Sequence, residues 1–284
     1  TFIGGISVNG SLTLNGGKAD HIYVGTGVTY ASLLAKGYAY QAKGQLVKRE
    51  NMADGIAVEV VKCGHPDGLT DTEACAYCGL TCPHSTVSDE TGLCQKCGSQ
   101  VYEANVTTAD GTVTGYRTLE EAVSHGAEAT VKLLADCVAE ETDEAFYVTE
   151  PLTLDLNGKR MEGPSGLIVQ KGPTTIQDSS PAQTGTIAGT SDWEYSGVGL
   201  WVFKDANVTL TILGGHFEGK TDGLQLAGQN TLILTGGSFS SMHFIEGAAA
   251  TLRDSLAPGY AYYKDVDNTL YDPGNDQKAT VGLH

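Results

Sequence analysis

This sequence has little positive charge, few charged residues of any kind and no long apolar run. Lys and Arg number 17 against 34 Asp and Glu, which gives a formal charge of −17 and a pI near 4.6. Nucleic-acid binding is excluded because phosphate contacts need a basic face, and an anionic membrane surface repels the chain for the same reason. No apolar run approaches the roughly 18 residues of a membrane-spanning helix, so we predict no membrane insertion of this segment.

Glycine is abundant where charge is scarce. It accounts for 37 of 284 residues, about twice its usual share. Apolar residues make up 40% of the chain, enough to build a core. The composition predicts an acidic, glycine-rich fold with many turns and little helix. The first residue falls inside a strand-like stretch, so we expect a fragment or a processed form.

Short strand patterns recur with a spacing of 22 residues. Leu-x-Leu or Leu-x-Ile followed by a Gly-Gly pair occurs at 12–17, 210–215 and 232–237, and Phe217 and Phe239 keep the same offset. A second strand type begins at 166, 199 and 223. Apolar and polar residues alternate, and no helical segment lies between the strands. We predict an all-β chain folded as a parallel β-helix with coils of about 22 residues. An antiparallel sandwich with strands of similar length is the alternative.

One short helix is expected at the start of this region. Thr118 and Glu121 form a capping box, and Leu119, Ala122 and Val123 make one apolar stripe, so the pattern predicts a helix over 119–125. A helix there covers the open strand edge of a β-helix, which is a structural role.

A longer repeat indicates the domain organisation. Residues 25–40 align with 247–262 at an offset of 222, with 8 of 16 positions identical. We therefore predict four segments. These are the C-terminal coils and cap of a preceding module (1–62), a cysteine insert (63–98), a β-helix module with its capping helix (99–263), and a linker or tail (264–284).

The cysteine insert contains the strongest motif. The spacing C-x-H-x9-C-x2-C occurs twice, at an offset of 19, and each copy supplies three thiolates and one imidazole. That is a usual ligand set for a closed structural zinc site, so we predict two structural Zn²⁺ ions. The ligands are Cys63, His65, Cys75, Cys78, Cys82, His84, Cys94 and Cys97. Disulfides are the alternative, but the seven cysteines are an odd number and disulfides do not require the two histidines. Sequential and interleaved ligand sets both remain open, although the repeat favours sequential sites.

Other chemistry is less well marked. Trp193, Tyr195 and Trp201 are candidates for a glycan platform, and the alternative places Trp201 in the interior. The best candidate catalytic cluster comprises Asp205, Glu218 and Asp222 with Lys204 and Lys220, and we interpret it as solvated turns. We assign structural roles to the corner residues Asp155 and Asn157, and we expect Cys137 to be a small buried apolar residue.

Three motifs resemble a known family. T-L-E-E-A-V at 118–123, V-K-L-L-A-D at 131–136 and L-T-L-D-L-N-G-K at 152–159 resemble β-helix modules of large surface proteins from gut Gram-positive bacteria. The cysteine insert is similar to inserts between such modules. The likeness is good over roughly 100–250 and loose over 1–60. The resemblance implies a right-handed β-helix, secretion or cell-surface display and an adhesive role, and it supplies no catalytic residues.

Together these observations predict a non-enzymatic stalk or adhesin in which zinc sites act as joints between rods. The expected partners are neighbouring modules of the same protein and a glycan or host surface ligand. Two alternatives remain: a carbohydrate-active β-helix enzyme of the polysaccharide lyase or hydrolase type, and a glycan- or host-protein-binding module without catalysis.

Overall fold

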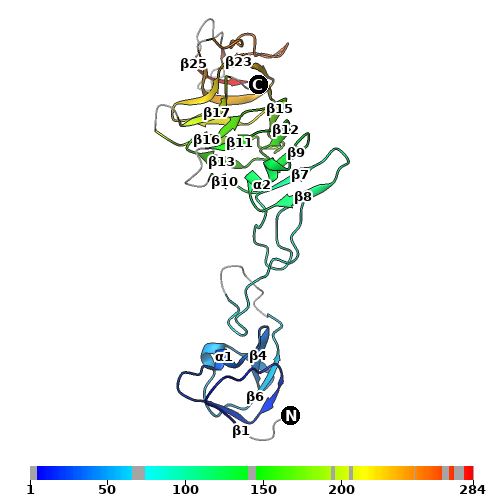
Figure 1. The fold of residues 1–284 in the computed structure, drawn as a ribbon, viewed down its shortest axis with the longest axis vertical. Coiled ribbons are helices and arrows are strands. Elements are labelled where there is room, and N and C mark those ends of the chain that lie inside the picture. The colour runs from blue at the N-terminus through cyan, green and yellow to red at the C-terminus, as the bar shows by residue number, and fades with distance from the viewer. Residues whose placement is uncertain are drawn as a thin grey trace. The chain divides into compact units, whose positions relative to one another are not determined.

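The computed structural model describes residues 5–65, 74–139, 145–192, 196–204, 207–245, 247–263, 269–271 and 278–283. Their regular secondary structure is almost all β-strand (Figure 1), with two short α-helices, α1 (Tyr30–Leu33) and α2 (Leu119–Ser124), and one 3-10 turn, η1 (Arg49–Asn51). The chain divides into two compact units. Unit 1 comprises Thr1–Val87 and Cys94–Ser99, and unit 2 comprises Ser88–Leu93 and Gln100–His284. The predicted all-β class is confirmed.

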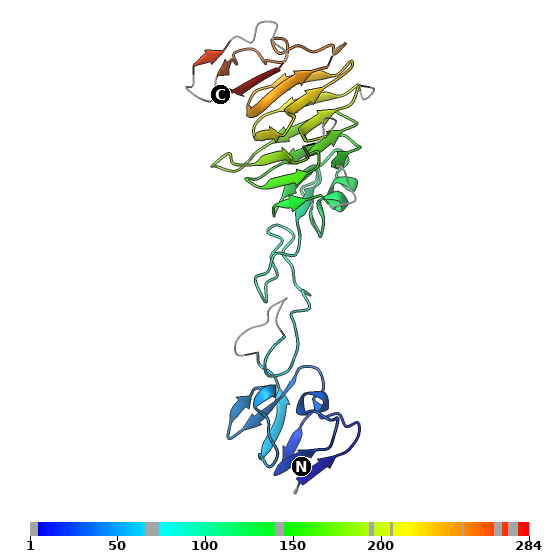
Figure 2. The same cartoon turned by 90° about the vertical axis from the view of Figure 1, so that its left-hand side faces the viewer.

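Unit 2 contains three ladders of parallel strands that the chain visits in turn (Figure 2). The first ladder is β9 (Thr130–Leu133), β12 (Leu152–Asp155), β15 (Thr174–Gln177), β18 (Thr209–Ile212) and β21 (Thr231–Leu234). The second is β10 (Cys137–Val138), β13 (Arg160–Gly163), β16 (Thr186–Gly189), β19 (His216–Gly219) and the start of β22 (Gly237–Phe244). The third is β11 (Phe146–Val148), β14 (Leu167–Val169), β17 (Val198–Val202), β20 (Asp222–Leu226) and the end of β22. The second and third ladders meet at β22 and form one curled sheet.

The register of these strands matches the repeat read from the sequence. Leu210 pairs with Leu232 and Phe217 with Phe239, both 22 residues apart. The pairing is parallel, so the antiparallel sandwich is wrong for unit 2. The spacing is not uniform, because Thr174 pairs with Leu210, 36 residues away. Only the strand positions must stack, whereas the corners between them can lengthen without disturbing the ladders.

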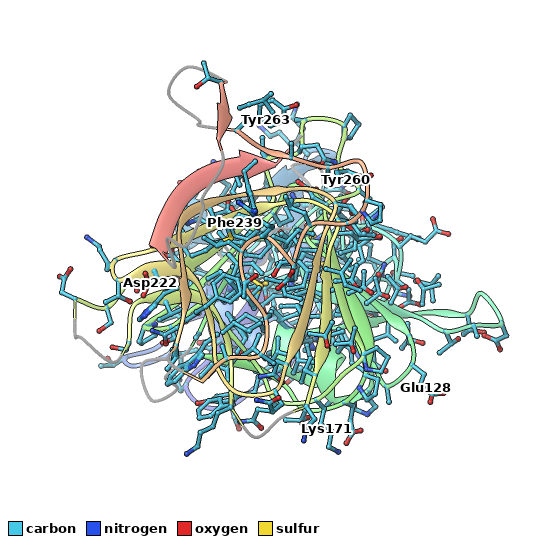
Figure 3. All side chains as sticks on the ribbon, turned by 90° about the horizontal axis from the view of Figure 1, so that it is seen from above. Glu128, Lys171, Asp222, Phe239, Tyr260 and Tyr263 are labelled. Carbon is cyan, nitrogen blue, oxygen red and sulfur yellow. The ribbon has the colours of Figure 1, made fainter. Side chains whose placement is uncertain are left out.

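Alternate side chains of the ladders fill one apolar interior. Leu200, Val202, Leu224 and Leu226 are fully buried, and the rings of Phe217 and Phe239 stack with centroids 4.9 Å apart and planes 12° apart. Figure 3 shows Phe239 among the packed side chains, whereas Glu128 and Lys171 lie at the periphery. Burial of this interior supplies the hydrophobic stabilisation of unit 2.

A hairpin and the predicted helix lie at the first rung of the ladders. The strands β7 (Ala104–Thr107) and β8 (Val113–Tyr116) form the hairpin, and β7 pairs antiparallel with β9. Helix α2 begins one residue after its N-cap Thr118, whose hydroxyl accepts from the Glu121 amide at 3.2 Å. The Leu119 amide donates to Oε2 of Glu103, a second capping group that the sequence pattern did not indicate.

Antiparallel strands lie at the last rung. Strand β25 (Lys278–Leu283) pairs with β22 and with β23 (Tyr262–Tyr263), which also pairs with β24 (Leu270–Tyr271). These strands include residues of the segment 264–284, for which the sequence predicted a linker or tail.

Unit 1 pairs β1 (Gly5–Val8) in parallel with β3 (His21–Val24). An antiparallel sheet follows in the order β2 (Gly17–Ala19), β6 (Val58–Lys62), β4 (Tyr38–Ala42) and β5 (Gln45–Val47). A separate apolar core, which includes Ile22, Leu33 and Tyr40, holds these strands together.

The internal repeat has the same hydrogen bonds in both units. The buried Tyr40 hydroxyl donates to the Tyr30 carbonyl at 2.9 Å, and the buried Tyr262 hydroxyl donates to the Leu252 carbonyl at 2.9 Å. A parallel bridge joins Leu14 to Leu34, and another joins Leu234 to Leu256. The sequence repeat is therefore a repeat of local structure.

Candidate metal centre

Four ligand-type side chains of unit 1 converge directly after β6. Cys63 follows the strand, and its amide donates to the Gly37 carbonyl at 2.8 Å. His65 has a φ of 50°, in the left-handed region. Cys75 and Cys78 lie on a tight turn that Gly79 closes, with a φ of 75° and an amide that donates to the Cys75 carbonyl at 2.7 Å.

The second cluster repeats this local structure. His84 has a φ of 47° and Gly98 a φ of 75°. The Gly98 amide donates to the Cys94 carbonyl at 2.8 Å, as Gly79 does to Cys75. The Cys94 amide donates to the Ser99 carbonyl at 2.9 Å, as the Cys75 amide does to Leu80. Identical spacing in the sequence has therefore produced the same turn twice.

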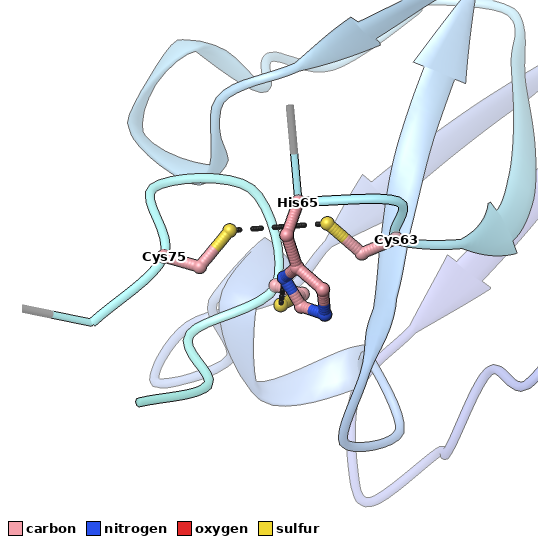
Figure 4. Close-up of side chains that lie close together, drawn as sticks. Cys63, His65 and Cys75 are labelled. Atoms are coloured by element: carbon pink, nitrogen blue, oxygen red, sulfur yellow. Dashed lines mark hydrogen bonds between the residues drawn. The ribbon is translucent and has the colours of Figure 1, made fainter. Parts of the chain in front are cut away.

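The distances within both clusters fit a tetrahedral metal site. In the first cluster, the sulfurs of Cys63 and Cys75 lie 3.8 Å apart, and the Cys78 sulfur lies 3.6 Å from Nδ1 of His65 (Figure 4). The corresponding distances in the second cluster are 3.5 Å and 3.7 Å. Metal–sulfur bonds of about 2.3 Å at tetrahedral angles place two sulfurs about 3.8 Å apart. In each cluster all four ligand atoms lie within 4.8 Å of one another.

The structure brings together all eight predicted ligands, in two sequential sets. Cys63, His65, Cys75 and Cys78 form one cluster, and Cys82, His84, Cys94 and Cys97 form the other. The interleaved arrangement is wrong for these residues. None of the seven cysteines is in a disulfide, and Cys137 is buried outside both clusters, as expected for a small apolar residue.

Each cluster has one thiol with a lowered pKa. Burial by itself would raise the pKa of the Cys75 thiol. Hydrogen bonds from the His65 ring and from backbone amides of the C-x2-C turn outweigh burial and lower this pKa to about 6. Hydrogen bonds from the amides of Cys97 and Lys96 lower the pKa of Cys94 to about 6. Burial raises the pKa of Cys78 to about 12. One thiolate per cluster therefore forms near neutral pH and can bind a cation first.

The candidate glycan residues fall only partly within the described structure. Trp193 and Tyr195 lie outside the described residues. Trp201 lies on β17 between Leu200 and Val202, both fully buried, and its half-buried ring stacks on Phe203 with centroids 4.6 Å apart and planes 16° apart. Trp201 therefore faces away from the apolar interior.

Glu218, Lys220 and Asp222 each contact a residue outside the candidate catalytic cluster. Asp205 lies outside the described residues. Glu218 forms a 3.0 Å ion pair with Arg160, and Lys220 lies 3.7 Å from Asp192. Asp222 is buried and accepts from Ser241 at 3.0 Å, and its Oδ2 lies 3.4 Å from Nδ1 of His243. The sequence pattern missed this aspartate–histidine contact because the two residues are 21 positions apart and meet only through the pairing of β20 with β22.

Comparison with family models, with curated proteins and with solved structures finds no match to this chain. Among the described helices, none has the length and apolar character needed to cross a membrane. The function is therefore argued from the site and the fold.

Proposed function

We propose that this protein is a non-enzymatic, zinc-stabilised repeat protein of the secreted or cell-surface class, which acts as a stalk or adhesin. The observation that carries this proposal is the pair of complete Cys3His clusters with metal-ligand distances. Three thiolates and one imidazole fill the four positions that Zn²⁺ prefers, so no position is left for a substrate. Zinc in such a closed site stabilises a fold and does no catalysis.

The zinc ions would hold a segment that has few other means to fold. The predicted insert (63–98) has few apolar residues, and the described part of it has no regular strand or helix beyond isolated bridges. The free energy of zinc binding then drives the folding of this segment, as it does in other small zinc modules. We propose that the two zinc sites act as joints between the flanking modules.

The parallel ladders support a right-handed parallel β-helix as the finer description of unit 2. Each strand from β9 to β19 pairs in parallel with the strand three places further along the chain, as a coil of three strands requires. A stack of coils with an interior filled by Leu, Ile, Val and Phe is a rod rather than a container. A rod with an acidic surface suits a spacer, because like charge keeps neighbouring copies apart.

Elemental analysis of the purified chain tests the metal proposal. We expect about two zinc ions per chain, and replacement of Cys94 by Ser should lower this to about one while Cys137→Ser leaves it unchanged. Chelation should unfold the insert, seen as loss of hydrogen-exchange protection over 63–98, and should leave the ladders of unit 2 protected. A chain without zinc whose thiols are all oxidised would contradict the proposal.

A second candidate function is a glycan- or host-protein-binding module. The ring of Trp201, on the outer side of β17, stacks on the ring of Phe203, and this stack favours such a function. Phe203 is 38% exposed. Gln225 and His243 continue the register of Trp201 across β20 and β22, so polar groups lie beside the rings. Sugars bind where an aromatic face adjoins hydrogen-bonding side chains.

A glycan array tests this second function. Binding that is lost in Trp201→Ala and kept in Tyr23→Ala, an exposed tyrosine of unit 1, would support it. An array with no bound glycan would contradict the glycan-binding function. Release of reducing ends from a bound polysaccharide would instead favour the carbohydrate-active enzyme.

A further inference from the structure

The two clusters have the same ligands but different surroundings. Cys63 and Cys78 belong to an apolar cluster with the fully buried Ala39, and Leu46 and Leu80 pack against it. Cys82 and Cys94 are covered, yet they belong to none of the apolar clusters in the described part of the chain. The first site is therefore packed into an apolar cluster, whereas the second site is covered without one.

Arg49 distinguishes the sites more sharply. It begins the turn η1, and its amide donates to the Ala76 carbonyl of the first C-x2-C loop at 2.9 Å. Its side chain reaches back to the Ala31 carbonyl, which accepts from Nη2 at 3.4 Å. Its Nε is buried and has no hydrogen-bond partner. A cavity of about 320 Å³ beside it is lined by both Arg49 and the ligand Cys75. A buried, unpaired donor that lines the same cavity as the ligand Cys75 is a candidate outer-shell partner of a filled metal site.

The glycines after the two C-x2-C turns locate this guanidinium. A Cβ atom added to Gly79 would lie 1.8 Å from Nη1 of Arg49. A Cβ atom added to Gly98, which has the same φ of 75°, would meet nothing within 4 Å. The guanidinium therefore lies against the first turn, and the equivalent space at the second turn is open.

The negative charge of a metal-filled site makes the position of the Arg49 guanidinium matter for metal retention. A divalent ion with three thiolates and a neutral imidazole has a net charge of about −1. A partly buried guanidinium close to that charge stabilises it more than a hydrated one does, because screening by water is weaker there. The cation within the second C-x2-C turn is the exposed Lys96, whose amine donates to the Ser85 hydroxyl at 3.0 Å.

We propose that Arg49 is a positioning residue for the first metal site and makes the two sites unequal. The first site retains its ion, and the second site is the one that exchanges. This inference rests on the proposed zinc-binding function and adds that the two ions have different roles. The embedded ion maintains unit 1, and the second ion responds to the metal supply.

Zinc transfer to a chromogenic chelator tests the proposal on the full chain. The native protein should release zinc in two phases of equal amplitude, and Cys97→Ser should retain only the slow phase. Arg49→Met should accelerate the slow phase by about 10-fold to 100-fold, the usual effect of losing an outer-shell partner, and should leave the fast phase unchanged. A single phase in the native protein, or an unchanged slow phase in Arg49→Met, would overturn it. A native chain that holds no zinc would refute the proposed function instead.

Two glycine variants guard against simple misfolding. Gly79→Ala and Gly98→Ala place the same strain on the backbone, because both residues have a φ of 75°. Only Gly79→Ala displaces the guanidinium. We expect Gly79→Ala to accelerate zinc release from the first site more than Gly98→Ala accelerates zinc release from the second site. Equal effects would show that the backbone, and not Arg49, sets the rate.

Discussion

Single corner residues connect successive rungs of unit 2. Asn157 has a φ of 48°, and its Nδ2 donates to the Leu133 carbonyl of the preceding rung at 2.8 Å. Oδ1 of Asp155 accepts from the Asn157 amide at 3.0 Å and from the Ser179 amide of the next rung at 2.9 Å. The structural role that the sequence predicted for both residues is confirmed. A side chain at a corner satisfies backbone groups that no strand can reach.

Replacement of Asn157 should separate these two effects. Asn157→Ala leaves the Leu133 carbonyl unpaired and strains the left-handed backbone, so we expect a loss of about 1–3 kcal/mol in the free energy of unfolding. Asn157→Gly removes the bond without the strain and should cost less. Chemical denaturation of unit 2 measures both, and equal losses would show that the backbone conformation contributes nothing.

At the metal ligands, the lowered thiol pKa values predict how zinc binding depends on pH. The pKa values of Cys75 and Cys94 lie at about 6, below that of an ordinary thiol. A depressed pKa favours the folded site at higher pH, and this contribution is lost as the pH falls through about 6. We expect zinc content to hold at pH 7 and to fall steeply below about pH 6. Dialysis at stepped pH followed by elemental analysis measures it. Retention of both ions at pH 4 would contradict the assignment of thiolate ligands.

At the scale of elements, register decides which side chains share the interior. The pairing of β19 with β22 places Phe239 directly on Phe217, and both rings are buried. The period of 22 residues made this contact predictable, because identical positions of stacked strands become neighbours. The 36-residue step from Thr174 to Leu210 breaks this period, and the sequence indicated it only as an insertion between coils at roughly 178–198.

The stacked phenylalanines should be energetically coupled. We expect Phe217→Leu and Phe239→Leu each to destabilise unit 2, and the double variant to lose less than their sum by about 0.5–1.5 kcal/mol, the usual worth of an aromatic pair. Denaturant unfolding of the native chain, the two single variants and the double variant gives the coupling energy of this double-mutant cycle. Strict additivity would show that the rings contribute only by burial.

At the scale of the whole molecule, two compact units contain copies of one local structure. The tyrosine bonds of Tyr40 and Tyr262 have the same length, and burial raises the pKa of both hydroxyls. Separate apolar clusters surround them. The units should therefore unfold as separate transitions with related local energetics.

Matched tyrosine variants test this independence. Tyr40→Phe leaves a part-buried carbonyl and Tyr262→Phe a buried carbonyl without its donor, and each should cost about 1–3 kcal/mol in its own unit alone. Tyr260→Phe, at a 40% exposed position, should change stability by less than about 0.5 kcal/mol. Calorimetry resolves the transitions. A variant that shifts both transitions equally would show that the units unfold together.

The sequence by itself determined the eight metal ligands, the strand period and the capping helix, whereas their grouping into two sequential sets came from the structure. All three depend on short spacings, and a C-x2-C turn or an N-cap is built from residues next to one another in the chain. The tertiary structure alone decided that Arg49 lies against one turn and not the other, and that Asp222 meets His243. Those contacts join residues 21 to 30 positions apart through strand pairing and loop packing, for which local sequence carries no signal.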